Sequence, residues 1–165
     1  MQPIFKFIFT PYIFALLTAL FSAAALIMAL IAQYGFDLEP CILCIYQRFP
    51  FAINVLLGLT AYKLASKNYP RGCGLIITLM GIVFLFNSGL AFYHTGVEQH
   101  WWVSAFEGCK IDPTNIREAA LNPPVPCDQI PWQMYGISMA GYNVIICGIA
   151  GIICTLFGIR EYKAH

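Results

Sequence analysis

Charged residues are scarce in this chain of 165 residues: Asp, Glu, Lys and Arg together make up 10% of it, against roughly 25% in an ordinary soluble domain. A soluble fold of this length needs a polar shell, and too few charges are present to form one, so the composition excludes a soluble enzyme. The formal net charge is +1 and the basic residues form no cluster. The chain therefore lacks the electrostatic footprint of a nucleic-acid-binding protein. Hydrophobic residues dominate instead, at 59%.

Long stretches without charge predict how the chain is organised. Uncharged segments cover residues 7–36, 72–97 and 129–159, and residues 40–62 are interrupted only by Arg48. Crossing a bilayer takes about 20 mainly apolar residues. We therefore predict an all-α membrane protein, a four-transmembrane-helix bundle forming a single domain over residues 1–165. The expected spans are 11–34, 42–62, 72–94 and 132–159, and the expected loops are 35–41, 63–71 and 95–131.

The charges in the loops predict the orientation of the bundle, because Lys and Arg near the spans stay on the cytoplasmic side. Lys6, Lys63, Lys67, Arg71, Arg160 and Lys163 all fall on the side of the two termini and the middle loop. On the other side Lys110 and Arg117 are outnumbered by acidic residues. We expect cytoplasmic termini and a long, Cys-containing periplasmic loop. The first span is expected to remain uncleaved, since its apolar run is about twice that of a signal peptide.

Seven cysteines fall into three groups. Cys41 and Cys44 form a Cys-Ile-Leu-Cys motif where the first outer loop becomes the second span, and Cys109 and Cys127 lie in the long outer loop. The remaining three lie in or beside the cytoplasmic ends of apolar spans, where a free cysteine behaves as a small buried hydrophobe. We assign no role to those three, which are Cys73, Cys147 and Cys154.

The Cys41–Cys44 motif favours redox chemistry. A Cys-x-x-Cys at a helix start places its thiols near unpaired backbone N–H groups and the positive end of the helix dipole, which stabilise a thiolate. Two purely structural disulfides are one alternative, and zinc is another, although Cys109 and Cys127 lack the close spacing of a zinc knuckle. Haem attachment would require His after the second cysteine, and residue 45 is Ile. We predict no metal site.

Arg48 and His94 are candidate partners for these thiols. Arg48 follows Cys44 by four residues and Cys41 by seven, so the three share one face of a helix. An ionised residue inside a span is a functional candidate. Its guanidinium suits a thiolate or an electron-accepting carbonyl oxygen; the alternative is snorkelling to a lipid head group. His94, at the outer end of the third span, can donate a hydrogen bond at the same depth.

The segment between Cys109 and Cys127 has its own signals. Asn115–Glu118 resembles a capping box, which predicts a short surface helix over Ile116–Leu121. A stiff proline-rich arm over residues 122–126 then leads to Cys127. Such an arm suits either presentation of a cysteine to another protein or a connector closed by one disulfide, and the composition does not decide between them.

The run Pro40-Cys41-Ile42-Leu43-Cys44-Ile45-Tyr46-Gln47-Arg48 resembles the disulfide-bond formation protein B (DsbB) family of bacterial inner membranes. Further similarities are Tyr93-His94-Thr95 at the end of the third span, the loop cysteines, and Pro131-Trp132 with Gly136-Ile137-Ser138 at the opening of the fourth span. The resemblance extends over essentially the whole chain. It implies a multi-pass inner-membrane protein, a monomeric bundle, with its active-site cysteines on the periplasmic side.

The resemblance also implies an activity, a cofactor and a partner. Members of the family re-oxidise a periplasmic thioredoxin-fold oxidase of DsbA type and pass two electrons to a membrane quinone, ubiquinone or menaquinone. By resemblance, Cys109 forms the mixed disulfide with the partner and Cys127 resolves it. Cys41 and Cys44 then take the electrons, with Cys44 facing the quinone. Arg48 and His94 match positions close to the quinone ring.

Other readings of the sequence give different functions. A vitamin-K-epoxide-reductase-like enzyme would carry its Cys-x-x-Cys on the last helix of the bundle, whereas here the motif opens the second span. A thiolate metal-binding or transport protein would bind metal in its reduced form without quinone turnover. A structural tetraspan protein with two disulfide staples would keep them oxidised when a reduced partner is added.

Overall fold

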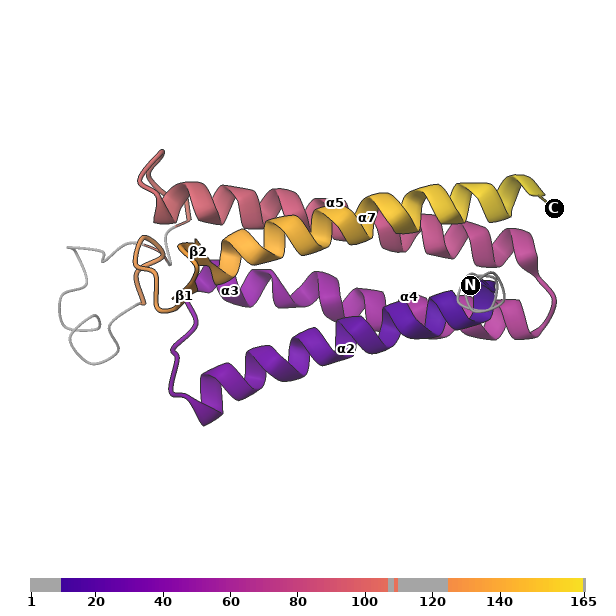
Figure 1. Cartoon of the computed structure of the whole chain (residues 1–165), viewed down its shortest axis with the longest axis horizontal. Helices are drawn as coiled ribbons and strands as arrows, with labels where there is room; N and C mark the ends of the chain where they lie inside the picture. Colours follow the sequence, from indigo (N-terminus) through magenta and orange to yellow (C-terminus); the bar gives the residue numbers. More distant parts are fainter. Residues whose placement is uncertain (1–9, 107–108, 110–124, 165) are drawn as a thin grey trace.

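The computed structural model describes residues 10–106, 109 and 125–164 (Figure 1). Its elements, in order, are α2 (Pro11–Gly35), α3 (Ile42–Tyr46), α4 (Arg48–Ser66), α5 (Pro70–Glu98), β1 (Gln133–Met134), β2 (Ile137–Ser138) and α7 (Met139–Ala164). The long helices run antiparallel along one axis. The start of α2, the connection between α4 and α5 and the end of α7 share one end of the bundle, while α3 and the hairpin share the other.

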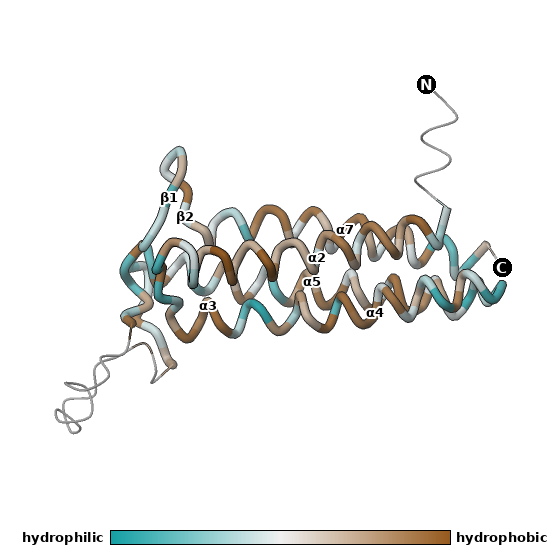
Figure 2. The backbone as a smooth tube through the Cα atoms, turned by 90° about the horizontal axis from the view of Figure 1, so that it is seen from below, coloured by the Kyte–Doolittle hydropathy of each residue, from teal (hydrophilic) through white to brown (hydrophobic). Residues whose placement is uncertain are grey.

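The described residues contain four helical segments that are long and apolar enough to cross a membrane. They are Pro11–Gly35, Ile42–Ser66, Pro70–Glu98 and Met139–Ala164, with 25 to 29 residues and mean hydropathy between 1.6 and 2.5. Figure 2 shows hydrophobic colouring along the middle of the helices and more hydrophilic residues toward both ends. Large apolar side chains such as Leu56 and Phe86 face outward, as expected where lipid is the solvent. The predicted four-helix membrane bundle is confirmed.

Local sequence explains where several helices start and stop. Pro11 and Pro70 occupy the first turns of α2 and α5, where the missing N–H of proline costs nothing. Helix α4 ends at Ser66 with Lys67 as its C-cap, after which Asn68 adopts a left-handed conformation with φ of 59°. The Tyr69 N–H then returns to the Leu64 carbonyl at 3.0 Å. This closing turn reverses the chain into α5.

Helices α5 and α7 pack closely because glycines face each other across their interface. A Cβ on Gly81 would lie 2.8 Å from the carbonyl oxygen of Gly151, and a Cβ on Gly151 would lie 3.0 Å from that of Gly81. The core beside this contact contains Phe84 and Ile77, both without exposed surface. Three unassigned cysteines are also buried in this core: Cys73, Cys147 and Cys154.

The second span has one local irregularity, at Gln47 between α3 and α4. Gln47 keeps α-helical dihedral angles and its N–H still donates to the Leu43 carbonyl at 3.1 Å, so the span runs as one helical segment from the predicted start at residue 42. Pro50 explains the irregularity, because its ring nitrogen has no hydrogen to donate to the carbonyl of Tyr46 one turn earlier. The Gln47 side chain is buried at this junction.

The last helix begins at Met139, later than the expected start at residue 132. The preceding residues form an antiparallel hairpin in which Gln133 pairs with Ser138. Its two-residue turn, Tyr135–Gly136, has positive φ at both positions, the geometry that suits the twist of a tight hairpin. Ser138 then starts α7, since its Oγ accepts the Gly141 N–H at 3.1 Å. The surface helix predicted over Ile116–Leu121 lies outside the described residues.

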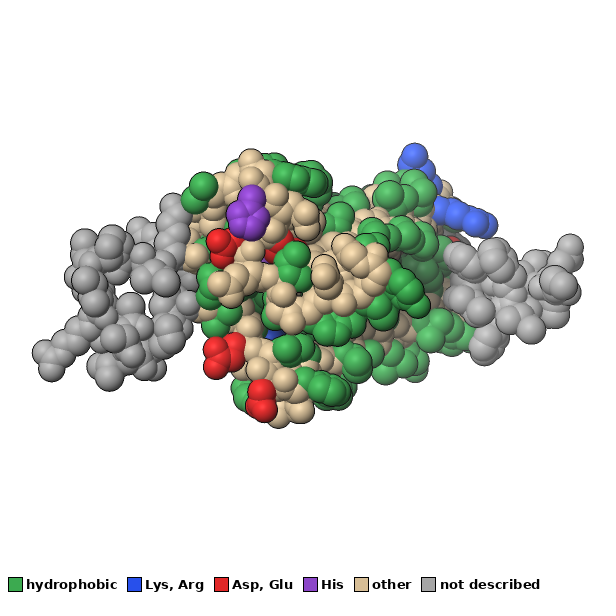
Figure 3. All heavy atoms as spheres, turned by 60° about the vertical axis from the view of Figure 1, so that its left-hand side comes forward, with side chains coloured by type: hydrophobic (Ala, Val, Ile, Leu, Met, Phe, Trp, Pro, Cys, Tyr) green, Lys and Arg blue, Asp and Glu red, His purple; other side chains and the backbone are tan. Residues whose placement is uncertain are grey.

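The charges of the described residues separate along the bundle. Figure 3 shows acidic side chains and a histidine toward the end that carries the cysteine motif, and basic side chains toward the opposite end. The described basic residues at that opposite end include Lys63, Lys67, Arg71 and Arg160. The distribution has the polarity used for the predicted orientation, which itself stays a prediction.

Candidate redox site

Cys41 caps the helix that contains Cys44. Its sulfur accepts the Cys44 backbone N–H at 3.4 Å, and the Cys41 and Cys44 sulfurs lie 3.2 Å apart as free thiols. The cap places the Cys41 sulfur at the unpaired N–H groups of the helix start. Cys41 is buried whereas Cys44 is only half-buried, so the two thiols face different surroundings.

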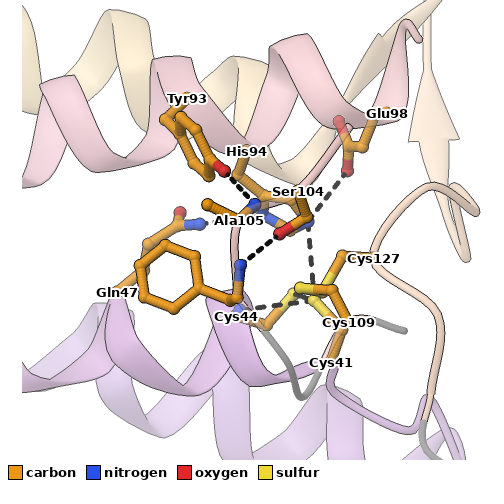
Figure 4. Close-up of a disulfide and its surroundings, with 11 residues drawn as sticks. Cys41, Cys44, Gln47, Tyr93, His94, Glu98, Ser104, Ala105, Cys109 and Cys127 are labelled. Carbon is orange, nitrogen blue, oxygen red and sulfur yellow. Dashed lines mark hydrogen bonds and ion pairs between the residues drawn. A yellow bond between two sulfur atoms is a disulfide. The ribbon is translucent and has the colours of Figure 1, made fainter. Parts of the chain in front are cut away.

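His94 reaches the same sulfur from α5. Its Nε2 lies 3.5 Å from Cys41 Sγ, and the histidine side chain is buried. One turn further along α5, Glu98 Oε1 lies 3.8 Å from that Nε2. The other oxygen of Glu98 accepts a hydrogen bond from the Ser138 hydroxyl. The residue before α7 is thereby tied to the end of α5. Figure 4 shows His94 and Glu98 of α5 beside the cysteine motif.

The surroundings of Cys41 favour its thiolate. Hydrogen bonding with the Cys44 thiol, followed by hydrogen bonding and charge interaction with His94, lowers the pKa of the Cys41 thiol well below its ordinary value. Burial acts in the opposite direction but is outweighed. The sequence argument treated the two thiols of the motif together, and the structure distinguishes them. The groups that stabilise negative charge converge on Cys41.

Cys109 and Cys127 form a disulfide, with an S–S distance of 2.00 Å. Cys127 is fully buried and packs with Cys41, Leu43 and Val97 in one hydrophobic cluster, against which Cys44 and Cys109 are also packed. Figure 4 shows the loop disulfide directly beside the Cys41–Cys44 pair. The fold therefore brings together two cysteine pairs that are more than sixty residues apart in the sequence.

Aromatic residues attach the start of the long loop to α5. Trp102 stacks on Tyr93 with ring centroids 6.0 Å apart, and its Nε1 donates to the Tyr93 carbonyl at 3.1 Å. The Tyr93 hydroxyl accepts the Ala105 N–H at 2.8 Å. Gly96 makes room for the indole, because a Cβ there would lie 2.0 Å from a Trp102 ring atom. Trp102 therefore holds the start of the chain that leads to Cys109 against α5.

Arg48 is directed elsewhere. Its Nη1 donates to Gln33 Oε1 of α2 at 2.7 Å, and the side chain is half-buried. The neighbouring Gln47 reaches His94 instead: the Gln47 Nε2 lies 2.9 Å from the His94 Nδ1. Two adjacent residues of the motif therefore make contacts with different helices, Gln47 with α5 and Arg48 with α2. The described contacts bring His94 to Cys41, and they pair Arg48 with α2.

Sequence reasoning did not single out Gln47, Glu98 or Ser138 as site residues. In the sequence Glu98 is one of the acidic residues on the outer side of the spans, and Gln47 is one residue of the motif. A signal was present in each case. Glu98 lies one helical turn after His94, and Gln47 lies one turn after Cys44. Ser138 gave a weaker signal, because its role depends on the hairpin.

Cys41, Cys44 and His94 are also the described residues that could hold a soft metal ion, since their ligand atoms lie within 4.8 Å of one another. A histidine that binds metal usually donates its second N–H to a carbonyl or carboxylate. Here the second nitrogen of His94 faces the amide nitrogen of Gln47. This arrangement favours a ring that donates a hydrogen bond from Nε2 over one that binds metal there.

Together these features define a class: a multi-pass membrane protein with two cysteine pairs packed at one end of a four-helix bundle. The family model described as "Disulfide bond formation protein DsbB" matches residues 11–157. The chain belongs to the DsbB family, as its motif predicted.

Curated relatives agree with this assignment. The chain is 30% identical to Disulfide bond formation protein B of Xylella fastidiosa (strain Temecula1 / ATCC 700964), over 87% of each chain. It is 25% identical to the protein of the same name from Haemophilus influenzae (strain 86-028NP), over 81% of this chain and 77% of the relative. It is also 28% identical to Uncharacterized protein RP370 of Rickettsia prowazekii, over 76% of this chain and 74% of the relative. No solved structure matches the chain.

Proposed function

We propose that this protein is a thiol:quinone oxidoreductase that re-oxidises a periplasmic dithiol oxidase of DsbA type and passes the electrons to a membrane quinone. Membership in the DsbB family supports a role in disulfide formation. The observation that carries the proposal is the shared cluster of the Cys109–Cys127 disulfide and the Cys41–Cys44 thiols. Exchange requires a thiolate to meet a disulfide, and this packing places the two side by side.

The proposed path has two exchanges between thiols and disulfides. A reduced partner dithiol attacks the Cys109–Cys127 disulfide; the partner leaves oxidised and the loop pair becomes a dithiol. The loop dithiol then reduces the Cys41–Cys44 disulfide, so that the loop pair is oxidised again and the helix pair carries two electrons and two protons. The structure has the redox states that follow this second exchange, with the loop disulfide formed and the helix thiols free.

The two helix thiols suit different partners in this path. Cys41 is buried in the cluster with Cys127, which suits exchange with the loop pair. Cys44 is half-buried on a helix at the end of the bundle, where an acceptor dissolved in the bilayer can approach. In the proposal Cys41 therefore exchanges with the loop, and Cys44 delivers electrons to the acceptor.

The side chains near Cys44 fit a quinone, whose carbonyl oxygens accept hydrogen bonds. Arg48 has a half-buried guanidinium one turn after Cys44, paired with Gln33, and His94 lies on the facing helix with its ring nitrogens toward Gln47 and Cys41. A bound quinone would supply the terminal chemistry by taking up two electrons and two protons. In the proposal His94 would line the site beside the ring, and Arg48 would turn from Gln33 to stabilise negative charge beside Cys44. A DsbA-type oxidase has a reduction potential of about −120 mV, so only an acceptor with a higher potential can re-oxidise it.

The orientation belongs to the same proposal. The cysteine end of the bundle faces the periplasm, where disulfides persist, and the basic end faces the cytoplasm. The charge separation of the described residues supports this orientation in a bacterial inner membrane. The orientation is tested by treating intact spheroplasts with a reductant, to open the Cys109–Cys127 disulfide, and then with a membrane-impermeant thiol reagent. Labelling of Cys109 is the expected result.

The proposal is tested by anaerobic quinone reduction with purified protein and a reduced DsbA-type partner. Ubiquinone and menaquinone are assayed separately, and wild type is compared with Cys44→Ser and Cys109→Ser. Cys73→Ala is the matched control, because Cys73 is a buried free thiol toward the other end of α5. We expect partner-dependent turnover that both test substitutions abolish and the control retains.

Other outcomes would refute the proposal. Folded wild-type protein with a closed loop disulfide and no turnover with either quinone would exclude the oxidoreductase. Stoichiometric zinc binding by the reduced protein, again without turnover, would favour a metal site at Cys41, Cys44 and His94. Turnover that persists in Cys44→Ser would remove Cys44 from the electron path.

A further inference from the structure

A run of side-chain hydrogen bonds continues from His94 into the apolar bundle. The Gln47 Nε2 lies 2.9 Å from His94 Nδ1, and the Gln47 Oε1 accepts from Asn143 Nδ2 at 2.6 Å. The Asn143 Oδ1 accepts from Cys147 Sγ at 2.9 Å. The Cys147 sulfur in turn accepts from Asn87 Nδ2 at 3.4 Å. The run joins the junction between α3 and α4 to α5 and α7. None of its amides has a role in the electron path proposed above.

The run has a direction because each primary amide donates from its nitrogen and accepts at its oxygen. The Cys147 thiol donates to the oxygen of Asn143, so the Asn143 nitrogen is left to face Gln47. That nitrogen donates to the oxygen of Gln47, so the Gln47 nitrogen is left to face His94. The Nδ1 of His94 must then accept, which places the single hydrogen of a neutral ring on Nε2.

The other side of the ring supports the same tautomer independently. The His94 Nε2 faces Cys41 Sγ at 3.5 Å and Glu98 Oε1 at 3.8 Å, and both atoms are acceptors when ionised. An Nε2 lone pair in that position would face the negative charge that the site stabilises on sulfur. An Nε2–H instead donates to it, as the second nitrogen of a histidine usually does when its first is fixed.

We propose that Gln47 and Asn143 are positioning residues that hold His94 as the Nε2–H tautomer, with that N–H aimed at the sulfur of Cys41. His94 touches the reacting thiol, and the two amides act through it. The proposal rests on the proposed function for its consequence in electron transfer. The tautomer itself can be measured without any turnover.

The direct test is ¹⁵N NMR of the reduced protein in detergent micelles, labelled at histidine. The chain has 3 histidines, so comparison with His94→Gln assigns the His94 signals. In wild type we expect a protonated Nε2 and an unprotonated Nδ1. Asn143→Asp replaces the donor amide by an isosteric carboxylate that only accepts. The Gln47 amide must then rotate, so that its nitrogen faces the new carboxylate and its oxygen faces His94. Because an oxygen accepts, the His94 Nδ1 should then carry the hydrogen.

Two further variants keep the test decisive. Ser88→Ala is the matched control: it removes another hydrogen bond between α5 and α7, from Ser88 Oγ to the Val144 carbonyl at 2.8 Å, and it should leave the ring unchanged. Gln47→Met avoids a buried charge if Asn143→Asp does not fold, and it should give a mixture of tautomers. We expect each ring change to shift the pH profile of Cys41 alkylation upward, by up to about 1 to 2 pH units for the loss of one hydrogen bond to an anion.

An Nδ1–H ring in wild type would overturn the proposal, because the amides would then run in the opposite sense. A ring that stays Nε2–H in folded Asn143→Asp and in folded Gln47→Met would also overturn it, since something else would hold the tautomer. If the ring responds as expected while the protein passes no electrons from partner to quinone, the positioning role stands and the proposed function fails.

Discussion

Replacing His94 by Leu is expected to change the acidity of Cys41 by a predictable amount. The His94 Nε2 lies 3.5 Å from the Cys41 sulfur, and both side chains are at least 95% buried, so solvent screens the contact little. A hydrogen bond to a charged group contributes about 1.5–3 kcal/mol. At about 1.4 kcal/mol per pH unit, its loss raises the pKa of the Cys41 thiol by about 1 to 2.

The assay is the pH dependence of Cys41 alkylation in the reduced protein, quantified by tandem mass spectrometry on the fragment that contains Cys41. The thiolate is the reactive form, and the wild-type pKa is well below its ordinary value. The wild-type rate should therefore be nearly flat from pH 6 to pH 8. In His94→Leu the rise in rate should move to higher pH, and the largest loss of reactivity should be found at the acidic end.

Two variants separate the hydrogen bond from general damage. His100→Leu removes an exposed histidine at the same end of the bundle and should leave the profile unchanged. His94→Gln keeps an N–H donor and should recover part of the low-pH reactivity. A folded His94→Leu protein with the wild-type profile would refute the reasoning, because another group would then have to stabilise the thiolate.

Three other predictions concern packing, capping and the acceptor end. Gly81→Ala places a methyl group 2.6 Å from the backbone nitrogen of Thr155, so thermal unfolding in detergent should show a free energy of unfolding lower by about 1–3 kcal/mol. Gly89→Ala lies on the same helix with open space around it and should leave the free energy of unfolding unchanged. Equal effects of the two substitutions would contradict the close contact. Ser138→Ala removes the cap of α7 and the donor to Glu98, so we expect the free energy of unfolding to fall by about 0.5–2 kcal/mol in the same assay. An unchanged melting temperature would show that the cap is dispensable. Arg48→Leu should raise KM for quinone about 10- to 100-fold. Gln33→Leu removes only the partner of the guanidinium and should raise KM less. A larger rise in KM for Gln33→Leu than for Arg48→Leu would assign Arg48 to the contact with α2.

The architecture could be predicted because it depends on features that are local in the sequence. Span length and hydropathy identify helices that cross a bilayer, and the Cys-x-x-Cys motif places its first thiol at a helix start. The structure confirms four such helices and places Cys41 as the cap of α3. The family resemblance, carried by the same motif, is confirmed by the match over residues 11–157.

What the sequence did not reveal depends on contacts between distant segments. Gln47 and Asn143 meet through packing between the second and fourth spans, 96 residues apart in the chain, and such a contact leaves no periodic signal. The late start of α7 similarly depends on the two-residue turn at Tyr135–Gly136, where positive φ values outweigh the apolar character of the segment. A polar residue inside a span, such as Asn143, was the available signal for a buried network.

The hydrogen bond from His94 also bears on the direction of the proposed electron path. A donor aimed at the Cys41 sulfur stabilises the reduced helix pair and has no thiolate to stabilise in the disulfide. It therefore makes the helix pair a stronger oxidant of the loop pair. A stabilisation of about 1.5–3 kcal/mol corresponds to about 30–65 mV for a two-electron couple. The same donor makes Cys41 a weaker nucleophile and a better leaving group, so it slows the return of electrons to the Cys109–Cys127 disulfide that packs beside it. Buried amides that touch neither cysteine pair can thus favour inward electron flow by fixing which nitrogen of one ring carries its hydrogen.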